Sequence, residues 1–151
     1  MAVEPSTGEL LITRVFNAPR ALVFKAWTDP AQLARWWGPH DYPATSISMD
    51  VRPGGRWRHR LMSPDTGNEL WLGGVFREIV PPERLVFTFA WEEDGERGLE
   101  TLVTVTFAER SGKTTMTFRQ APFRSDAQRE GHGYGWNSTF DRLVDHLAAL
   151  S

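Results

Sequence analysis

The last part of the chain alternates between apolar and polar residues with the period of a helix. Its apolar residues recur at spacings of four, three, four and three, which places them on one helical face: Trp136, Phe140, Leu143, Leu147 and Leu150. The polar side chains of the same segment belong to the opposite face: Asp141, Arg142, Asp145 and His146. Just upstream, Ser125 and Gln128 have the spacing of a capping box. The pattern predicts an amphipathic helix over residues 125–150 that covers an apolar surface.

Two shorter helices are predicted near the start of the chain. Pro19 suits the first turn of a helix, and Leu22, Val23, Ala26 and Trp27 supply its apolar face. Asp29 then has the features of an N-cap, because Pro30 and Gln32 follow it. We expect this second helix to end near Trp37, where Gly38 and Pro39 stop it.

The remaining segments have the alternation of strands. An isolated strand is expected at 10–16, and about six more follow the short helices, at 45–51, 56–61, 69–80, 85–91, 99–109 and 113–120. Short links such as Ser111-Gly112 indicate hairpins, so neighbouring strands should run antiparallel. Gly73-Gly74 predicts a bulge or kink inside the long strand.

These elements predict one α+β domain over residues 1–151, with residues 1–9 disordered. A chain of 151 residues is long enough to bury a core of its own. The sheet has one apolar face, and the long amphipathic helix has another, so the two satisfy each other only by packing together. The helix should therefore lie across the concave side of a curved antiparallel sheet.

Composition narrows the possible functions. The net charge of −2 argues against nucleic acid as the main partner, because binding phosphates requires a basic surface. No segment has the apolar length of a membrane span, the start lacks a secretion signal, and there is no cysteine, so a cytoplasmic protein is expected. Seven tryptophans and nine phenylalanines are more than a small core needs for volume, and aromatic side chains also line ligand cavities.

Four separated motifs resemble a known family. They lie at residues 17–39, 50–58, 74–88 and 135–143, and include the runs Leu33-Ala34-Arg35-Trp36-Trp37-Gly38-Pro39 and Asp50-Val51-Arg52-Pro53-Gly54-Gly55. In this order they are similar to the small single-domain relatives of the C-terminal domain of the activator of the Hsp90 ATPase. Those proteins belong to the START-like, or Bet v 1-like (SRPBCC), superfamily, and the resemblance covers about residues 10–150.

The resemblance implies a helix-grip fold with an elongated cavity between the sheet and the long helix. Since successive strand residues point to opposite faces of the sheet, the alternation assigns side chains to the cavity wall. The face on which Trp71 lies depends on the kink expected at Gly73-Gly74. The predicted ligand-binding residues are Trp37, Trp57, His59, Trp71, Phe87, Phe89, Trp91, Met116, Phe118, Tyr134, Trp136 and Phe140. Most aromatic residues of this set are expected to be ordinary core, and only the rest to contact a ligand.

Other polar features each have two interpretations. His59 alternates with Trp57 and Leu61, so it either orients or protonates a ligand or is a hydrogen-bonded core histidine. The arginines at 52, 56, 58 and 60 could bind an anion, but their alternation favours the solvated face of a sheet. The glycine-rich run 131–135 lacks the last glycine of a nucleotide-binding fingerprint, and it could instead act as a gate to the cavity.

Three functions remain open. The first is non-catalytic binding of a small hydrophobic or aromatic ligand, by a monomer or homodimer without cofactor or metal. The second, implied by the resemblance alone, is an Hsp90-type co-chaperone or a stress-related protein that binds another protein. The third is an enzyme acting on a hydrophobic substrate, with His59 and Tyr134 as acid–base groups.

Overall fold

The computed structural model describes residues 8–150 and contains three helices and eight strands in that part of the chain. The sequence predicted that residues 1–9 are disordered. Residues 1–7 of this segment lie outside the described residues. Glu9, just after them, pairs its carboxylate with Arg119 at 2.6 Å. The elements are β1 (Leu10–Phe16), α1 (Arg20–Thr28), α2 (Pro30–Trp36), β2 (Ala44–Met49), β3 (Arg56–Met62), β4 (Glu69–Val80), β5 (Arg84–Glu93), β6 (Glu96–Arg97), β7 (Thr101–Arg110), β8 (Lys113–Ala121) and α3 (Asp126–Ala149).

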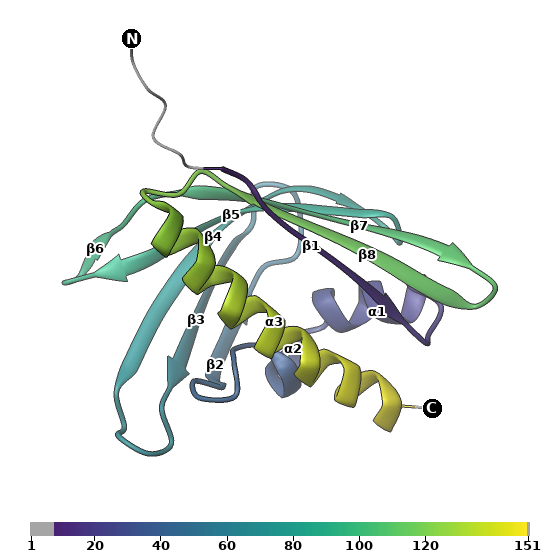
Figure 1. Ribbon diagram of the computed structural model, residues 1–151, viewed down its shortest axis with the longest axis horizontal. Coiled ribbons are helices and arrows are strands. Elements are labelled where there is room, and N and C mark those ends of the chain that lie inside the picture. Colours follow the sequence, from purple (N-terminus) through teal and green to yellow (C-terminus); the bar gives the residue numbers. More distant parts are fainter. Residues whose placement is uncertain (1–7, 151) are drawn as a thin grey trace, which may run out of the picture.

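The strands form one antiparallel sheet in the order β1-β8-β7-β5-β4-β3-β2, and the two-residue strand β6 pairs with β5. Figure 1 shows this sheet curving over α3, with α1 and α2 on the same side of the sheet. The α+β helix-grip fold predicted from the sequence is confirmed. The expected two short helices after the first strand and the long closing helix are all present.

The helix starts follow the predicted capping chemistry. The Asp29 carboxylate accepts a hydrogen bond from the Ala31 backbone N–H at 3.1 Å, and Pro30 occupies the first turn of α2. At α3 the Ser125 hydroxyl accepts from the Gln128 N–H at 3.0 Å. The Gln128 amide oxygen accepts in return from Arg124 N–H at 2.7 Å, one residue before the cap.

The irregularity in β4 differs from the prediction. The β3–β4 register runs through Gly73 and Gly74 without a shift, whereas the β4–β5 register shifts between Phe76 and Glu78. The predicted bulge at the glycine pair is therefore wrong. Gly74 serves a close approach of strands instead, because a Cβ there would collide with the carbonyl oxygen of Thr88.

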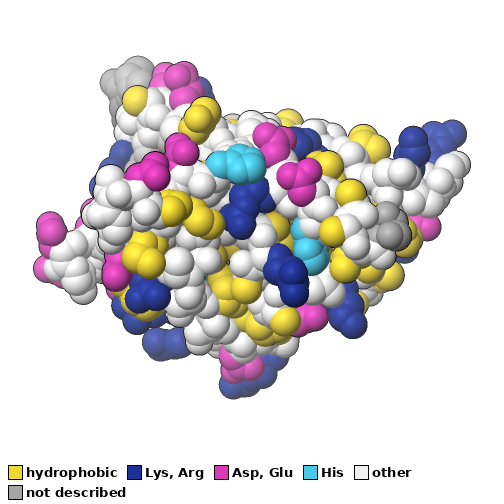
Figure 2. All heavy atoms as spheres, turned by 90° about the horizontal axis from the view of Figure 1, so that it is seen from below, with side chains coloured by type: hydrophobic (Ala, Val, Ile, Leu, Met, Phe, Trp, Pro, Cys, Tyr) yellow, Lys and Arg dark blue, Asp and Glu magenta, His cyan; other side chains and the backbone are white. Residues whose placement is uncertain are grey.

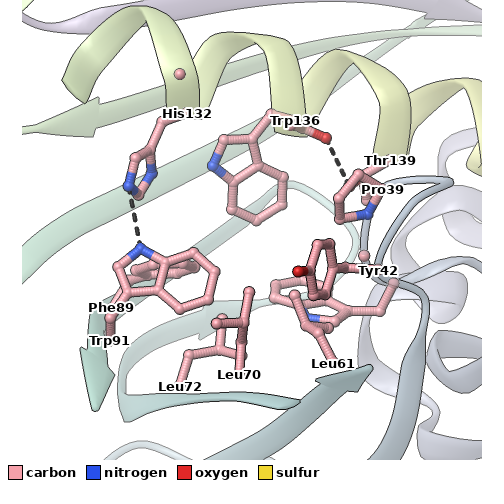
Figure 3. A pocket seen from close by; sticks show the side chains of 14 residues that line it. Pro39, Tyr42, Leu61, Leu70, Leu72, Phe89, Trp91, His132, Trp136 and Thr139 are labelled. Carbon is pink, nitrogen blue, oxygen red and sulfur yellow. Dashed lines mark hydrogen bonds between the residues drawn. The ribbon is translucent and has the colours of Figure 1, made fainter. Parts of the chain in front are cut away.

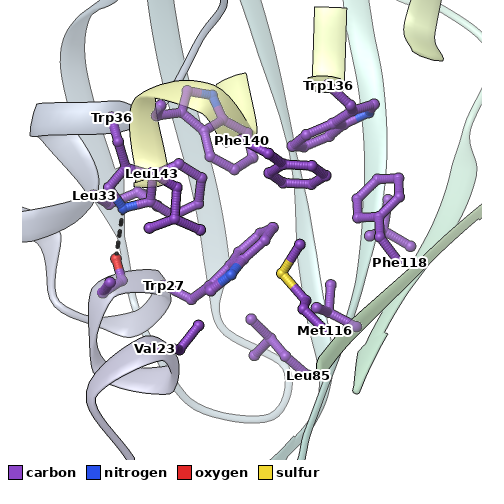
Figure 4. Close-up of a cluster of buried hydrophobic side chains, with 14 of the residues drawn as sticks. Val23, Trp27, Leu33, Trp36, Leu85, Met116, Phe118, Trp136, Phe140 and Leu143 are labelled. Carbon is purple, nitrogen blue, oxygen red and sulfur yellow. Dashed lines mark hydrogen bonds between the residues drawn. The ribbon is translucent and has the colours of Figure 1, made fainter. Parts of the chain in front are cut away.

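The core fills most of the space between the sheet and the helices. Figure 4 shows Trp27 of α1 at its centre, with Phe140 and Leu143 of α3 on one side and Leu85 and Met116 of the sheet on the other. These side chains are all fully or almost fully buried. Their packing explains why α3 needs an apolar stripe along most of its length.

Two expectations for the end of α3 are wrong. Leu150 is 45% exposed, so the buried stripe ends at Leu147. His146 was expected on the solvated face but is buried, because α2 packs there and the Gln32 side-chain oxygen lies 3.0 Å from its Nε2. Because α2 packs against the side of α3, the buried face of α3 is wider than the single apolar stripe predicted from the sequence.

The outer face of the sheet carries Arg56, Arg58 and Arg60, as the solvated-face interpretation predicted, whereas Arg52 lies in the loop between β2 and β3. Arg58 forms a bidentate ion pair with Glu92, with N–O distances of 2.7 and 2.9 Å. Its guanidinium also lies 3.9 Å from the ring centroid of Trp71. Because Arg60 pairs with Trp71 across the β3–β4 ladder, Trp71 shares the outer face with the arginines. Its predicted place on the cavity wall is wrong.

Candidate functional site

A pocket of about 130 Å³ lies between the first half of α3 and the sheet. Figure 3 shows His132, Trp136 and Thr139 of α3 on one side of it and Phe89, Trp91 and three leucines of the sheet on the other. The loop after α2 adds Pro39 and Tyr42. Figure 2 shows the molecule from below, where hydrophobic side chains gather in the middle of the face and charged side chains surround them. None of the described residues that line the pocket is Asp, Glu, Lys or Arg.

His132 and Trp91 connect α3 to β5 across the pocket. The Trp91 indole Nε1 donates a hydrogen bond to His132 Nε2 at 3.1 Å. The imidazole also meets the edges of Phe89 and Phe123, with ring centroids 5.7 and 5.1 Å away. Burial lowers the pKa of His132 to about 4, so the ring is neutral at pH 7.

A chain of buried hydrogen bonds runs behind the pocket from Trp136 of α3 to Phe89 of β5. Trp136 Nε1 donates to the Gln120 side-chain oxygen at 2.9 Å, and the Gln120 amide donates to the Thr101 hydroxyl at 2.9 Å. Thr101 in turn donates to the Phe89 carbonyl at 3.0 Å. Two pocket residues on different elements, Trp136 and Phe89, are thereby held in register by polar groups behind them.

The loop that forms the rim of the pocket is anchored to α3. Arg142 donates hydrogen bonds to the carbonyls of Trp37, Gly38 and Arg35 at 2.9, 2.8 and 3.0 Å. These carbonyls lie at the end of α2, where a cation also complements the helix dipole. Ser138 accepts from the His40 N–H at 2.9 Å. The loop is therefore tied to α3 at two places.

The inner part of the helix–sheet space is filled. His59 is only 2% exposed and packs between Trp37 and Trp57, with ring centroids 5.2 and 4.8 Å away. Its Nδ1 accepts a hydrogen bond from the Ser48 N–H at 3.4 Å. Burial lowers its pKa to about 4. The void beside it measures about 10 Å³, close to the volume of one water-sized probe.

The predicted site residues fall into three groups. Four of them line the open pocket: Trp37, Phe89, Trp91 and Trp136. Six belong to the filled core: Trp57, His59, Phe87, Met116, Phe118 and Phe140. Two lie elsewhere, since Trp71 is on the outer face and Tyr134 is 74% exposed. Tyr134 is wrong as a wall residue because it is two residues from both His132 and Trp136, which puts it on the far side of a helix.

The residues that the sequence interpretation missed come mostly from α3 and the loop after α2. His132 and Thr139 stand four residues before Trp136 and three after it, so the helical period already pointed to both. Leu70 and Leu72 follow from the β4 register once Trp71 is placed outside. No pattern in the sequence indicated Tyr42, because a loop has no period.

A curved antiparallel sheet that grips a long C-terminal helix, with a pocket between them, defines the START-like class of domains. Within this class, the model of the family described as Activator of Hsp90 ATPase homolog 1-like protein matches residues 17–148. The chain belongs to this family.

Solved structures agree with this assignment. The chain is similar to the AHSA1 protein of Silicibacter pomeroyi, with 25% identity, 95% of this chain and 100% of that one covered, and a TM-score of 0.86. It is also similar to a Chromobacterium violaceum protein, with 28% identity, 91% and 94% of the two chains covered, and a TM-score of 0.83. An Arthrobacter aurescens protein has 25% identity, coverage of 98% and 90%, and a TM-score of 0.85. A search of curated proteins found no match to the chain.

Residues 8–150 lack both a cluster of metal-binding side chains and a membrane-spanning helix. This part of the chain holds no group of three or more His, Cys, Asp or Glu side chains that could bind a metal ion. Each helix in this part of the chain is either too short or too polar to span a bilayer.

Proposed function

We propose that this protein binds one small hydrophobic or aromatic molecule in the pocket between the sheet and the first half of α3, without catalysing a reaction on it. The observation that carries the proposal is the pocket itself, which is walled by Trp37, Phe89, Trp91 and Trp136. Concave apolar sites with a few polar groups are the usual form of small-molecule sites.

The volume limits the size of the ligand. A buried apolar cavity of about 150 Å³ takes up benzene in another protein. The volume of about 130 Å³ here therefore suits one ring, with any larger part of the ligand extending through the opening. Long acyl chains and fused ring systems would exceed the enclosed part.

The acid–base groups near the pocket favour binding over catalysis. A general acid or base works best with a pKa near the working pH. Burial lowers the pKa of both His132 and His59 to about 4, and His59 stands inside the filled core. Tyr134, the other candidate for an enzymatic role, is directed to solvent. These placements do not support the enzyme hypothesis built on His59 and Tyr134.

A matched pair of variants tests the proposal. A Cβ at Gly135 meets no atom within 4 Å, so Gly135→Met extends into the pocket, whereas Tyr134→Met puts the same side chain outside. We expect toluene and α-methylstyrene to bind wild type and Y134M with 1:1 stoichiometry by calorimetry, and G135M to lose this binding. Wild-type protein that binds neither probe, or G135M that binds as well as wild type, would contradict the proposal.

Family membership supports a second candidate, a co-chaperone or another protein-binding role. The family description names the activator of the Hsp90 ATPase, and the match covers residues 17–148. The test is the ATPase rate of Hsp90 with and without an excess of this protein. A raised rate supports the role, and an unchanged rate together with no complex in a pull-down argues against it.

Location and assembly remain predictions. The absence of cysteine from the sequence is consistent with the reducing cytoplasm, and a monomer or a homodimer is expected. Fractionation of the cells and light scattering of the purified protein would test the two expectations separately.

A further inference from the structure

The polar groups of the pocket indicate which ligand chemistry it accepts. Indole side chains can only donate hydrogen bonds, and three of them line the pocket. Thr139 uses its hydroxyl proton on the Gly135 carbonyl of its own helix, at 2.8 Å. The Tyr42 oxygen accepts a hydrogen bond from the Asn68 amide at 3.2 Å, so its own proton is left to donate. The indole N–H groups of Trp91 and Trp136 are already taken up by His132 and Gln120, so they do not donate to a ligand. The Tyr42 hydroxyl and the His132 imidazole are among the groups that can.

The tautomer of His132 follows from its bond to Trp91. Indole Nε1 always carries a hydrogen and accepts nothing, so the His132 Nε2 that lies 3.1 Å from it must be the unprotonated nitrogen. Because the lowered pKa keeps the imidazole neutral at pH 7, its one hydrogen is on Nδ1. Figure 3 shows the ring standing between α3 and Trp91, with its other nitrogen on the side of the pocket.

The ring is held in this orientation by its surroundings. Phe89 and Phe123 contact the imidazole at 66° and 62° to its plane, and the bond to Trp91 fixes the remaining rotation. A donor that is already oriented loses little freedom when a ligand binds. Among the described residues that line the pocket there is no charged side chain to pair with an ionic ligand. Burying an unpaired charge is strongly unfavourable.

We propose that Nδ1–H of His132 is the recognition donor of the pocket, and that the ligand is an uncharged ring compound bearing a hydrogen-bond acceptor such as a carbonyl oxygen. This inference rests on the proposed binding function and gives it a chemical class. It also assigns a role to the bond between Trp91 and His132, which selects the tautomer that donates.

The test uses two probes of nearly equal shape. Acetophenone carries a carbonyl oxygen where α-methylstyrene carries a CH₂ group, so their affinity ratio measures one acceptor. His132→Gln places its amide at the distance of Nε2, where the oxygen accepts from Trp91, but offers no donor at Nδ1. His132→Asn places an amide N–H at the distance of Nδ1. We expect the ratio to fall about fivefold in H132Q and to recover in H132N, since one hydrogen bond changes affinity by roughly that factor.

A second pair of probes tests whether the ligand must be uncharged. Benzamide and benzoate differ little in shape, and we expect wild type to bind benzamide at least about tenfold more tightly, because benzoate must lose its hydration without a cation to pair with. Benzoate that binds as tightly as benzamide would overturn the uncharged class.

The outcomes separate the two proposals. If wild type binds both acetophenone and α-methylstyrene but the ratio is the same in wild type, H132Q and H132N, only the role of His132 is overturned. If wild type binds neither probe, the binding function fails, and this inference fails with it. Thermal unfolding of each variant checks that the comparison is made on folded protein.

Discussion

Trp136 and Gln120 join α3 to β8 through a buried hydrogen bond of 2.9 Å from the indole Nε1 to the side-chain oxygen. Gln120 is fully buried, and its amide continues the chain to Thr101. An indole that forms a pocket wall therefore has its angle set from behind, by a polar group that no ligand touches.

Gln120→Leu should lower the free energy of unfolding by about 2 kcal/mol. The buried Trp136 N–H loses its acceptor, and the Thr101 hydroxyl loses the bond that it accepts while keeping its bond to the Phe89 carbonyl. Urea unfolding followed by fluorescence measures the change. Thr115→Val, on the exposed face of the same strand, is the control and should alter stability by less than about 0.5 kcal/mol. Equal stability of Q120L and wild type would show that the hydrogen bond between Trp136 and Gln120 does not stabilise the fold.

Arg142 should stabilise the protein far more than an ordinary surface charge. Arg142→Met removes the hydrogen bonds to the carbonyls of Arg35, Trp37 and Gly38, of which the Trp37 carbonyl keeps the Ala44 N–H, and should cost about 2 kcal/mol. Arg142→Lys should recover only part of this, since an ammonium cannot reproduce the planar fork.

The ion pair between Arg14 of β1 and Asp141 of α3, at 2.9 Å, provides the comparison. Asp141→Asn should change stability by less than about 1 kcal/mol, as solvated ion pairs do. Denaturant titration of the three variants in one buffer checks the order, and a larger effect of D141N than of R142M would refute it.

Alanine at the two glycines on the pocket side of α3 should raise the stability of the protein and weaken ligand binding. A Cβ at Gly131 or Gly135 meets no atom within 4 Å, so alanine is accommodated and raises helix propensity, by about 0.5 to 1 kcal/mol per site. The same methyl groups occupy the pocket, so G131A/G135A should melt higher and bind α-methylstyrene more weakly.

Gly133 is the internal comparison, because it does not line the pocket and a Cβ there comes within 3.2 Å of Leu10 Cδ1. Gly133→Ala should leave affinity unchanged. Weaker binding in G133A than in G131A/G135A would mean that helix rigidity, and not occupied volume, controls the affinity.

Acid should destabilise the protein through His59. Its pKa is lowered to about 4 by burial in the folded state, against a usual value of 6.5 in the unfolded chain. Between these values the unfolded chain holds the extra proton, so stability is complete above about pH 6.5 and is lost as the pH falls toward 4. The shift corresponds to about 3 kcal/mol over the window.

Urea unfolding at several pH values from 7 to 4 measures this slope. His132 acts in the same direction, because burial lowers its pKa to about 4 as well. His59→Leu should therefore reduce the slope without removing it, and H59L/H132Q should reduce it further. An unchanged slope in H59L would contradict the assignment to His59.

The local chemistry of the chain determined the elements and their order. Ser125, Asp29 and Pro30 start helices wherever they stand in the three-dimensional structure, because a cap satisfies the N–H groups of its own first turn. Alternation likewise specifies which strand residues share a face, and the antiparallel helix-grip arrangement follows from short links and one apolar face per element.

Only the tertiary structure decided which part of the apolar face is open. Periodicity names the face that a side chain occupies but not the distance to the element opposite, so His59 and Phe89 look alike in the sequence. His59 became core because Trp37 of the α2 end packs on it, whereas Phe89 meets open space below the first half of α3. His132 and Trp91 are 41 residues apart along the chain, and their bond exists only because α3 crosses β5 there.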